Sequence, residues 1–463
     1  MPCCACGQPE AVSFAALDSG LLGPLFATDA MRAAFSDEAR LHAMLQAEVA
    51  LAVAEAEAGL VPEALGTALA AVRMQAFDVQ ALGRATALSG VPTIPFVTAL
   101  QKLLPRELEP FVHKGATTQD IADTALVLMI GAGLELIRAD LNRILPALAA
   151  MARAHRRTPC IGRTYGQHAA PVSFGFKVAV WATGIAEVAE QGPLVRRHMM
   201  KASLAGPVGT LSALGDKGPE VLERFARHLN LGCDAISWHT RRDRMAELGA
   251  WLARLMGALA KMAGDIAHLA STEVAEVAEP FVKGRGGSSA MPHKRNPMGC
   301  TLILAAQEAA PGFLSTLLNA MAAAHERPAG AWHGEWHALP ALFGLASGAL
   351  REAVALAEGL EIDPARMRAI IDLTHGLIFA DAVAARLAPA LGREGAHHLV
   401  KRAADSVRRS GQPLESVLAT MPEVIKAGGV AAAFDLASAL EAAALWTDRA
   451  LAKLPLKVVI AET

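Results

Sequence analysis

A seam of apolar residues between Met245 and Leu269 constrains the fold of this chain more than any other feature. Apolar side chains recur there at alternating steps of three and four residues, namely Met245, Leu248, Leu252, Leu255, Leu259, Met262, Ile266 and Leu269. This spacing keeps one apolar stripe on a single helix face, as in a coiled coil. The proline-free segment 243–279 would extend about 55 Å as one helix. It therefore predicts a long helical bundle, completed by other subunits.

Other segments are also predicted to be helical. Residues 118–145 contain no proline, Thr117 or Thr118 can cap the helix start, and Asp120 lies favourably in its first turn. Further helices are predicted over residues 36–60, over 173–201 with a break at Pro193, over 298–324 with a bend near Pro311, and from Asp363-Pro364 onward. We find no alternating strand-length runs joined by hairpin turns.

The composition supports an all-α protein. Hydrophobic residues make up 53% of the 463 residues but aromatic residues only 5%, because the apolar content is mainly Ala, Leu and Val. Ala and Leu are strong helix formers. A chain of this length exceeds one compact core. We expect an N-terminal helical domain over 1–116 with residues 1–20 disordered, a central long-helix bundle over 117–362, and a small C-terminal helical domain over 363–463.

Charge and cysteine usage exclude several classes of protein. The formal net charge of −2 does not suggest a polyanion-binding surface. Cys3, Cys4 and Cys6 cluster at the start, but a zinc site needs a second pair of ligands, and the first histidine is His42. We expect no metal there and read the cluster as part of a disordered terminus. With no long uncharged apolar run and no Lys or Arg among the first thirty residues, we expect a soluble, cytoplasmic protein.

A glycine-rich, cation-bearing loop separates two of the predicted helices. Residues 284–297 read GRGGSSAMPHKRNP, with three glycines in four residues followed by two serines and then by Lys294 and Arg295. Successive backbone N–H groups in such a loop can form an anion-binding nest. By composition alone, a flexible connector is an equally good interpretation.

The full string resembles the GSSxMPxKxNP motif of the fumarase/aspartase superfamily, with every fixed position matched. Residues 113–120, HKGATTQD, resemble the HxGxTSxD region of that family, and residues 162–168, GRTYGQH, resemble its GRTHxQ region. The resemblance extends from about Phe26 to Gly411. It implies a three-domain α-helical protomer whose central bundle assembles into a homotetramer, with each active site shared by three subunits.

The resemblance also implies roles for single residues. The family reaction is β-elimination from a carboxylate, or its reverse, and Ser288 matches the loop serine that acts as base. A serine must be held as an alkoxide for this role, and Lys294 with the surrounding nest is suited to hold it. His113 is a further catalytic candidate. Asn296, Thr117, Thr118 and Gln167 match substrate contacts, although Thr117 is also explained by helix capping.

The departures from the motifs indicate a branch of the superfamily. Tyr165 replaces the histidine that protonates amine or hydroxyl leaving groups. A carboxylate leaving group needs little such help, because its conjugate acid has a pKa near 4, and cycloisomerases also have an aromatic residue here. Residues 325–340, HERPAGAWHGEWHALP, resemble the corresponding run of 3-carboxy-cis,cis-muconate cycloisomerases. Arg327 can pair bidentately with a substrate carboxylate, and Trp332 and Trp336 are expected to wall the pocket. His333 and His337, although at helical spacing, are expected to make ring or polar contacts rather than bind metal.

The resemblance thus implies lactonisation of a small polycarboxylate, 3-carboxy-cis,cis-muconate, to a carboxymuconolactone in protocatechuate breakdown, without metal or organic cofactor. Leu25-Phe26 stand where adenylosuccinate lyases have a phosphate-binding Arg-Tyr pair, which disfavours a nucleotide substrate. Val91 and Lys114 depart from the cycloisomerase pattern and could change the substrate. The alternatives are a superfamily lyase acting on a small succinate derivative, of the adenylosuccinate or nitrosuccinate type, and a catalytically silent structural tetramer.

Overall fold

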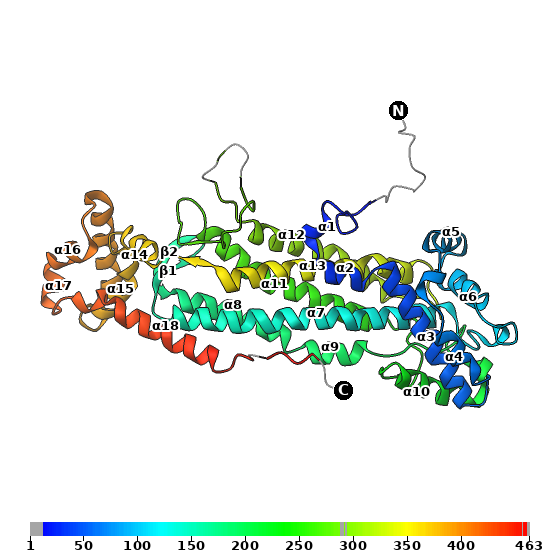
Figure 1. Cartoon of the computed structure of the whole chain (residues 1–463). Helices are drawn as coiled ribbons and strands as arrows, with labels where there is room; N and C mark the ends of the chain where they lie inside the picture. Colours follow the sequence, from blue (N-terminus) through cyan, green and yellow to red (C-terminus); the bar gives the residue numbers. More distant parts are fainter. Residues whose placement is uncertain (1–12, 288–290, 292–293, 456, 461–463) are drawn as a thin grey trace.

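A computed structural model describes residues 13–287, 291, 294–455 and 457–460. Ser288 and Cys3, Cys4 and Cys6 lie outside these residues. The described chain is mostly helical and forms an elongated body in which long helices run side by side (Figure 1). These are α7 (Thr118–Ala154), α8 (Phe174–Ala189), α11 (Asp243–Leu269), α12 (Met298–Ala320) and α13 (Ala331–Gly359).

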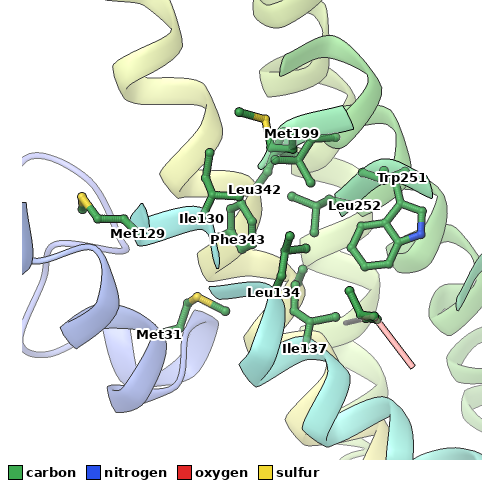
Figure 2. Close-up of a cluster of buried hydrophobic side chains, with 14 of the residues drawn as sticks. Met31, Met129, Ile130, Leu134, Ile137, Met199, Trp251, Leu252, Leu342 and Phe343 are labelled. Atoms are coloured by element: carbon green, nitrogen blue, oxygen red, sulfur yellow. The ribbon is translucent and has the colours of Figure 1, made fainter. Parts of the chain in front are cut away.

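The apolar seam lies on α11 and is buried along its whole length, from Met245 at 0% exposure to Leu269 at 2%. Figure 2 shows part of the core that it enters, where Leu252 of α11 lies among Leu134 of α7 and Phe343 of α13. The predicted helix over 243–279 is too long, however, because α11 ends at Leu269. The chain then turns into the short strand β3 (Val277–Ala278), which pairs with β4 (Glu361–Ile362). The absence of proline allows a segment to be helical, but it does not by itself make the helix continue.

The predicted helix starts are confirmed. The Ser36 hydroxyl accepts a hydrogen bond from the backbone of Ala39 at the start of α3 (Asp37–Glu57). The Asp363 carboxylate caps α14 (Pro364–Asp372) in the same way. The break near Pro193 separates α8 from α9 (Gly192–Met199). Helix α7 runs further than predicted, since it continues through Pro146 to Ala154, whereas α12 continues through Pro311 but ends at Ala320, before the predicted residue 324.

Shorter helices lie at both ends of the long body (Figure 1). At the end where α7 begins, they include α4 (Ala64–Ala70), α5 (Val79–Ser89), α6 (Thr93–Gln101) and α10 (Gly218–His228), while α1 (Gly23–Phe26) and α2 (Asp29–Ala34) lie along α13. At the other end are α15 (Ala380–Ser410), α16 (Leu414–Ala419) and α17 (Pro422–Lys426), and α18 (Leu436–Leu451) packs back against α8. Helices α15 to α17 enclose a hydrophobic cluster of their own.

A β-hairpin corrects the expectation that hairpins are absent. Strand β1 (Pro159–Thr164) pairs antiparallel with β2 (Gln167–Ser173) at the far end of α7. The two turn residues, Tyr165 and Gly166, have φ values of 51° and 76°. Positive φ at both central positions is the geometry of a type I′ turn, whose twist matches that of the paired strands. The hairpin therefore presents the Tyr165 side chain at its tip.

Helix α12 leaves an apolar surface uncovered. By length and composition alone, α12 and α13 could each cross a membrane. The apolar window of α13 is 83% buried within the protein, as in the core helix of a soluble protein, whereas that of α12 is only 22% buried. Gln307 and the exposed Glu308 lie in the middle of α12, and such groups are costly in lipid. The surface of α12 is therefore suited to contact with other protein helices.

Candidate active site

The His113 ring is held in place by a buried carboxylate. Its Nδ1 lies 2.6 Å from Oε1 of Glu48 on α3, which is 1% exposed. Burial lowers the pKa of His113, but the charge and hydrogen bond of Glu48, with a further contribution from Asp120, outweigh it and raise the pKa above 6.5. His113 also has a φ of 62°, a strained conformation for a non-glycine residue. The contact with Glu48 thus favours the protonated ring and fixes its orientation.

Asp120 organises the segment that carries Thr117 and Thr118. Its carboxylate is fully buried and accepts hydrogen bonds of 2.9 Å from the backbone N–H groups of Thr117, Ala205 and Gly206. The same carboxylate lies 2.6 Å from Nε2 of His239. The bond to Thr117 caps α7 in the predicted manner. Both threonines remain half-buried at the helix start, so that capping and substrate contact are compatible.

Arg327 and Trp332 reach the same helix start from the other side. Arg327 donates from Nε to Oε1 of Gln119 at 2.9 Å. The indole N–H of Trp332, at the start of α13, donates to Asp123 at 2.9 Å. Four of the predicted site residues, His113, Thr117, Arg327 and Trp332, are therefore tied to the first two turns of α7 or to the segment before it.

A buried ion cluster beneath them was not predicted from the sequence. Arg242 is 1% exposed and pairs with Asp123 at 2.7 Å and with Glu335. Although burial opposes it, the two carboxylates raise the pKa of Arg242 above its usual range. Desolvation raises the pKa of Glu335, and Arg242 opposes this. The only signal for this cluster was the position of Glu335 within the tryptophan-rich run.

Three rings at the start of α13 form an aromatic wall that is connected to Arg327 through Asp123 and Gln119. Trp332 and Trp336 meet edge to face with ring centroids 5.0 Å apart, and His333 lies 4.5 Å from Trp336. The Nε2 of His333 contacts the carbonyl of Gly90 at 3.1 Å, so that nitrogen is the donor. His333 therefore makes the predicted ring and polar contacts. The Gly90 contact also ties the segment containing Val91 to this wall.

Lys114, one of the departures from the motif, is directed toward α3. Its ammonium donates to the carbonyl of Leu60 at 2.8 Å, and it is the countercharge nearest Glu55. Burial, reinforced by the charge of Glu48 and opposed by Lys114, raises the pKa of Glu55 to about 8. In this protomer Lys114 thus serves the buried carboxylates of α3.

The hairpin holds the second group of predicted residues, Tyr165 and Gln167. Tyr165 is 104% exposed and Gln167 is also exposed. Close to the turn, the hairpin is anchored to the body of the protein, because Arg163 forms a bidentate pair with the fully buried Glu276 at 2.8 and 3.2 Å. A large aromatic ring held in solvent on an anchored turn is suited to contact with another chain.

The glycine-rich loop holds the third group. Asn296 binds the carbonyl of Gly286 through both its backbone N–H, at 2.9 Å, and its side chain, at 3.0 Å. Gly286 has a φ of 66°, and a Cβ there would lie 2.6 Å from the carbonyl oxygen of Asn296, so this closure requires glycine. Lys294 is exposed. Arg295 pairs with Glu361 at 3.0 Å and is thereby committed to the loop base.

The protomer does not bring these three groups together. Helix α7, with 37 residues, spans about 55 Å, and it separates Thr117 and Thr118 from the hairpin at its far end (Figure 1). Helix α12, with 23 residues, spans about 35 Å, and it separates Asn296 from Arg327. In the described part of the protomer, Thr117 and Thr118, the hairpin residues Tyr165 and Gln167, and the loop residue Asn296 therefore lie in three separate places.

The family model described as Lyase matches residues 25–312, and the model described as Adenylosuccinate lyase C-terminus matches residues 376–450. The chain is 43% identical over 410 residues to 3-carboxy-cis,cis-muconate cycloisomerase of Bradyrhizobium diazoefficiens, covering 88% of this chain and 91% of that protein. It is 42% identical to nitrosuccinate lyase of Streptomyces davaonensis, covering 89% of each. The crystal structure of 3-carboxy-cis,cis-muconate lactonizing enzyme from Pseudomonas putida superimposes with a TM-score of 0.87 at 41% identity, covering 93% of this chain and 97% of that one.

Proposed function

The chain belongs to the fumarase/aspartase superfamily of lyases, and on that basis we propose that it is a 3-carboxy-cis,cis-muconate cycloisomerase. The observation that carries the proposal is the aromatic wall of Trp332, His333 and Trp336 that is connected to the exposed guanidinium of Arg327. An aromatic cluster joined to a bidentate cation fits a conjugated polycarboxylate, because the diene can contact the exposed His333 and half-buried Trp336 rings while a carboxylate pairs with the arginine.

The reaction is an isomerisation, so no atoms are gained or lost. One substrate carboxylate oxygen forms a bond to a diene carbon, and a proton is delivered to the carbon beside another carboxylate. By resemblance, Ser288 delivers that proton, and in the reverse direction its alkoxide removes it. Lys294 and Asn296 would stabilise the alkoxide and bind a carboxylate, and Thr117 and Thr118 would donate hydrogen bonds to the substrate.

The charge state of the site is consistent with this chemistry. His113, whose pKa the Glu48 carboxylate raises, would in its protonated form add positive charge near the carbon that becomes an aci-carboxylate, and such preorganised charge lowers the barrier. Tyr165 stands where other superfamily members have an acidic histidine. In the reverse direction the leaving group is a carboxylate, which needs no strong acid, so a phenol that shapes the pocket is sufficient.

We further propose a homotetramer in which three subunits contribute to each site. Support comes from the distance between the three residue groups along α7 and α12, from the fully exposed Tyr165 ring, and from the uncovered apolar surface of α12. The proposed domains are 1–116, 117–362 and 363–463. A cytoplasmic location suits the buried free thiols of Cys160 and Cys300. Burial also raises the pKa of the Cys160 thiol to about 12.

A second candidate is a nitrosuccinate lyase, favoured by the relative of that name. Nitrite, like carboxylate, leaves as a weak base, so Tyr165 suits both reactions. The two substrates differ in shape, because nitrosuccinate is small and tetrahedral at the reacting carbons. It would use less of the aromatic wall, which is why we place it second.

The two functions are separated by incubating the purified protein with each substrate. Loss of the diene absorbance of 3-carboxy-cis,cis-muconate, abolished in Ser288→Ala, supports the cycloisomerase. Nitrite release from nitrosuccinate without loss of diene absorbance would replace it with the lyase. Sedimentation tests the assembly, and a stable 48.3 kDa monomer at micromolar concentration would contradict the shared site.

A further inference from the structure

The exposed Arg327 guanidinium is anchored by a side chain that no motif singled out. Its Nε–H donates to Oε1 of Gln119 at 2.9 Å, across 208 positions of sequence. Gln119 lies one residue after Thr118 and is 0% exposed. Its amide nitrogen donates to Oδ2 of Asp123 at 3.1 Å and to the carbonyl of His239 at 2.9 Å. Every polar atom of this buried amide is therefore in use.

The orientation of the Gln119 amide is determined by its partners. Arg327 can only donate, whereas the Asp123 carboxylate and the His239 carbonyl can only accept. Rotating the amide by 180° would place its NH2 group against the Nε–H of Arg327, and its carbonyl oxygen against the Asp123 carboxylate and the His239 carbonyl. The carbonyl oxygen therefore points to Arg327 in the one arrangement that satisfies all four groups.

This contact leaves the outer edge of the guanidinium, formed by its two Nη groups, open to a substrate. With Nε engaged by Gln119, the two Nη groups remain for a substrate carboxylate, and no described residue hydrogen-bonds either of them. The anchor is also neutral, so it does not cancel the positive charge of Arg327. The carboxylate that Gln119 also binds, that of Asp123, is already paired with Arg242.

We propose that Gln119 is a positioning residue for substrate binding, which aims the Nη edge of Arg327 at a carboxylate of a planar polycarboxylate substrate while leaving its charge uncompensated. This inference rests on the proposed function in one respect, the assignment of Arg327 to a substrate carboxylate. It predicts that Gln119 and Arg327 act as one unit. Substitutions at residues that act through each other are non-additive, whereas independent structural losses add.

The test is a double-mutant cycle with Gln119→Met, Arg327→Met and the double variant. The measured quantity is the Kd of propane-1,2,3-tricarboxylate, a tricarboxylate that does not react, determined by titration calorimetry. We expect each single variant to weaken binding by about 10-fold to 100-fold, the scale of one hydrogen bond to a charged group. The double variant should bind within about twofold of Arg327→Met. Losses that multiply would overturn the proposal, because Gln119 would then act independently of Arg327.

Two further variants keep the test decisive. Asn142, on the same helix, binds the backbone of Val458 through both its amide oxygen and its amide nitrogen, so Asn142→Leu controls for loss of an amide and should leave Kd unchanged. If Gln119→Met fails to fold, Arg327→Lys replaces it, because lysine keeps the charge but cannot bind Gln119 and present a two-pronged edge together. We expect a loss of at least about 10-fold, and wild-type affinity in Arg327→Lys would refute the positioning role.

Turnover is measured separately, so the two proposals can fail separately. A wild-type protein that binds the tricarboxylate but does not consume 3-carboxy-cis,cis-muconate would remove the proposed function and leave the cycle intact. A wild-type protein that binds no tricarboxylate would overturn the role of Arg327, and that of Gln119 with it. Where turnover is seen, Gln119→Met should raise KM more than it lowers kcat, because the lost interaction is with a carboxylate that does not react.

Discussion

Replacing Glu55 by glutamine is expected to stabilise the protein at neutral and alkaline pH. The Glu55 side chain is 1% exposed, and neither of its carboxyl oxygens has a hydrogen-bond partner among the described residues. Burial, with the nearby charge of Glu48, raises its pKa from 4.5 to about 8. A raised folded-state pKa means that the stability present below pH 4.5 is lost progressively as the pH rises to about 8. The loss is roughly 3 kcal/mol at pH 7 and roughly 5 kcal/mol above pH 8.

Glutamine has nearly the same shape as the protonated acid and cannot ionise. Glu55→Gln should therefore match the wild type near pH 5 and exceed its unfolding free energy by a few kcal/mol at pH 7 to 9. The assay is thermal and urea unfolding at pH 5, 7 and 9 at fixed protein concentration, because assembly makes the midpoint concentration-dependent. Glu63→Gln, the same change at an exposed position, is the control. A variant that is less stable at pH 8, or a difference that does not grow with pH, would refute the reasoning.

Three further predictions concern the reaction, measured as kcat/KM on whichever substrate the wild type consumes. Glu48→Gln removes the carboxylate that keeps the pKa of His113 raised against its burial, so the alkaline limb of the pH profile should move to lower pH. Glu48→Asp should restore part of it, and an unchanged profile would show that His113 does not titrate in the reaction. Ser288→Ala should lower turnover at least about 100-fold while sedimentation stays unchanged, and activity above a tenth of wild type would remove Ser288 from catalysis. Tyr165→Phe should cost less than about tenfold, whereas a thousandfold loss would identify the phenol as an acid and favour a lyase with a poorer leaving group.

The parts of the fold that depend on residues close together in the sequence could be predicted from the sequence. The seam on α11 and the caps at Ser36, Thr117 and Asp363 depend on residues a few positions apart, and each is observed. The end of α11 depends instead on distant partners. Instead of continuing the helix, Glu276 pairs with Arg163, which lies 113 positions away, and Val277 pairs with Ile362. Residues 270–279 show no periodic pattern from which those contacts could be predicted.

The hairpin was missed because its strands do not alternate between polar and apolar residues. The inner residues Cys160 and Ile161 are consecutive and both buried, while much of β2 is exposed. The usable signal was the Tyr165-Gly166 pair, since glycine readily adopts the positive φ that a tight hairpin turn requires. Motif matching identified candidate site residues but not the residues that hold them in place. Glu48, Gln119 and Arg242 act through partners 65, 208 and 119 positions away.

These supporting residues bear on how a site shared between chains, as we propose for this protein, could be formed accurately. A catalytic group must be held within about 0.5 Å of its working position, and contacts made only on assembly would leave each part loose beforehand. Here each part is fixed inside its own protomer: Arg327 by Gln119, the hairpin by the pair of Arg163 with Glu276, and the loop by the closure of Gly286 on Asn296. Assembly into the proposed tetramer would then have only to align these preformed parts, and the uncovered apolar surface of α12 is suited to that contact. A substitution in a supporting residue should therefore impair binding or turnover without changing the oligomeric state, whereas a polar substitution on the exposed face of α12 should change both together.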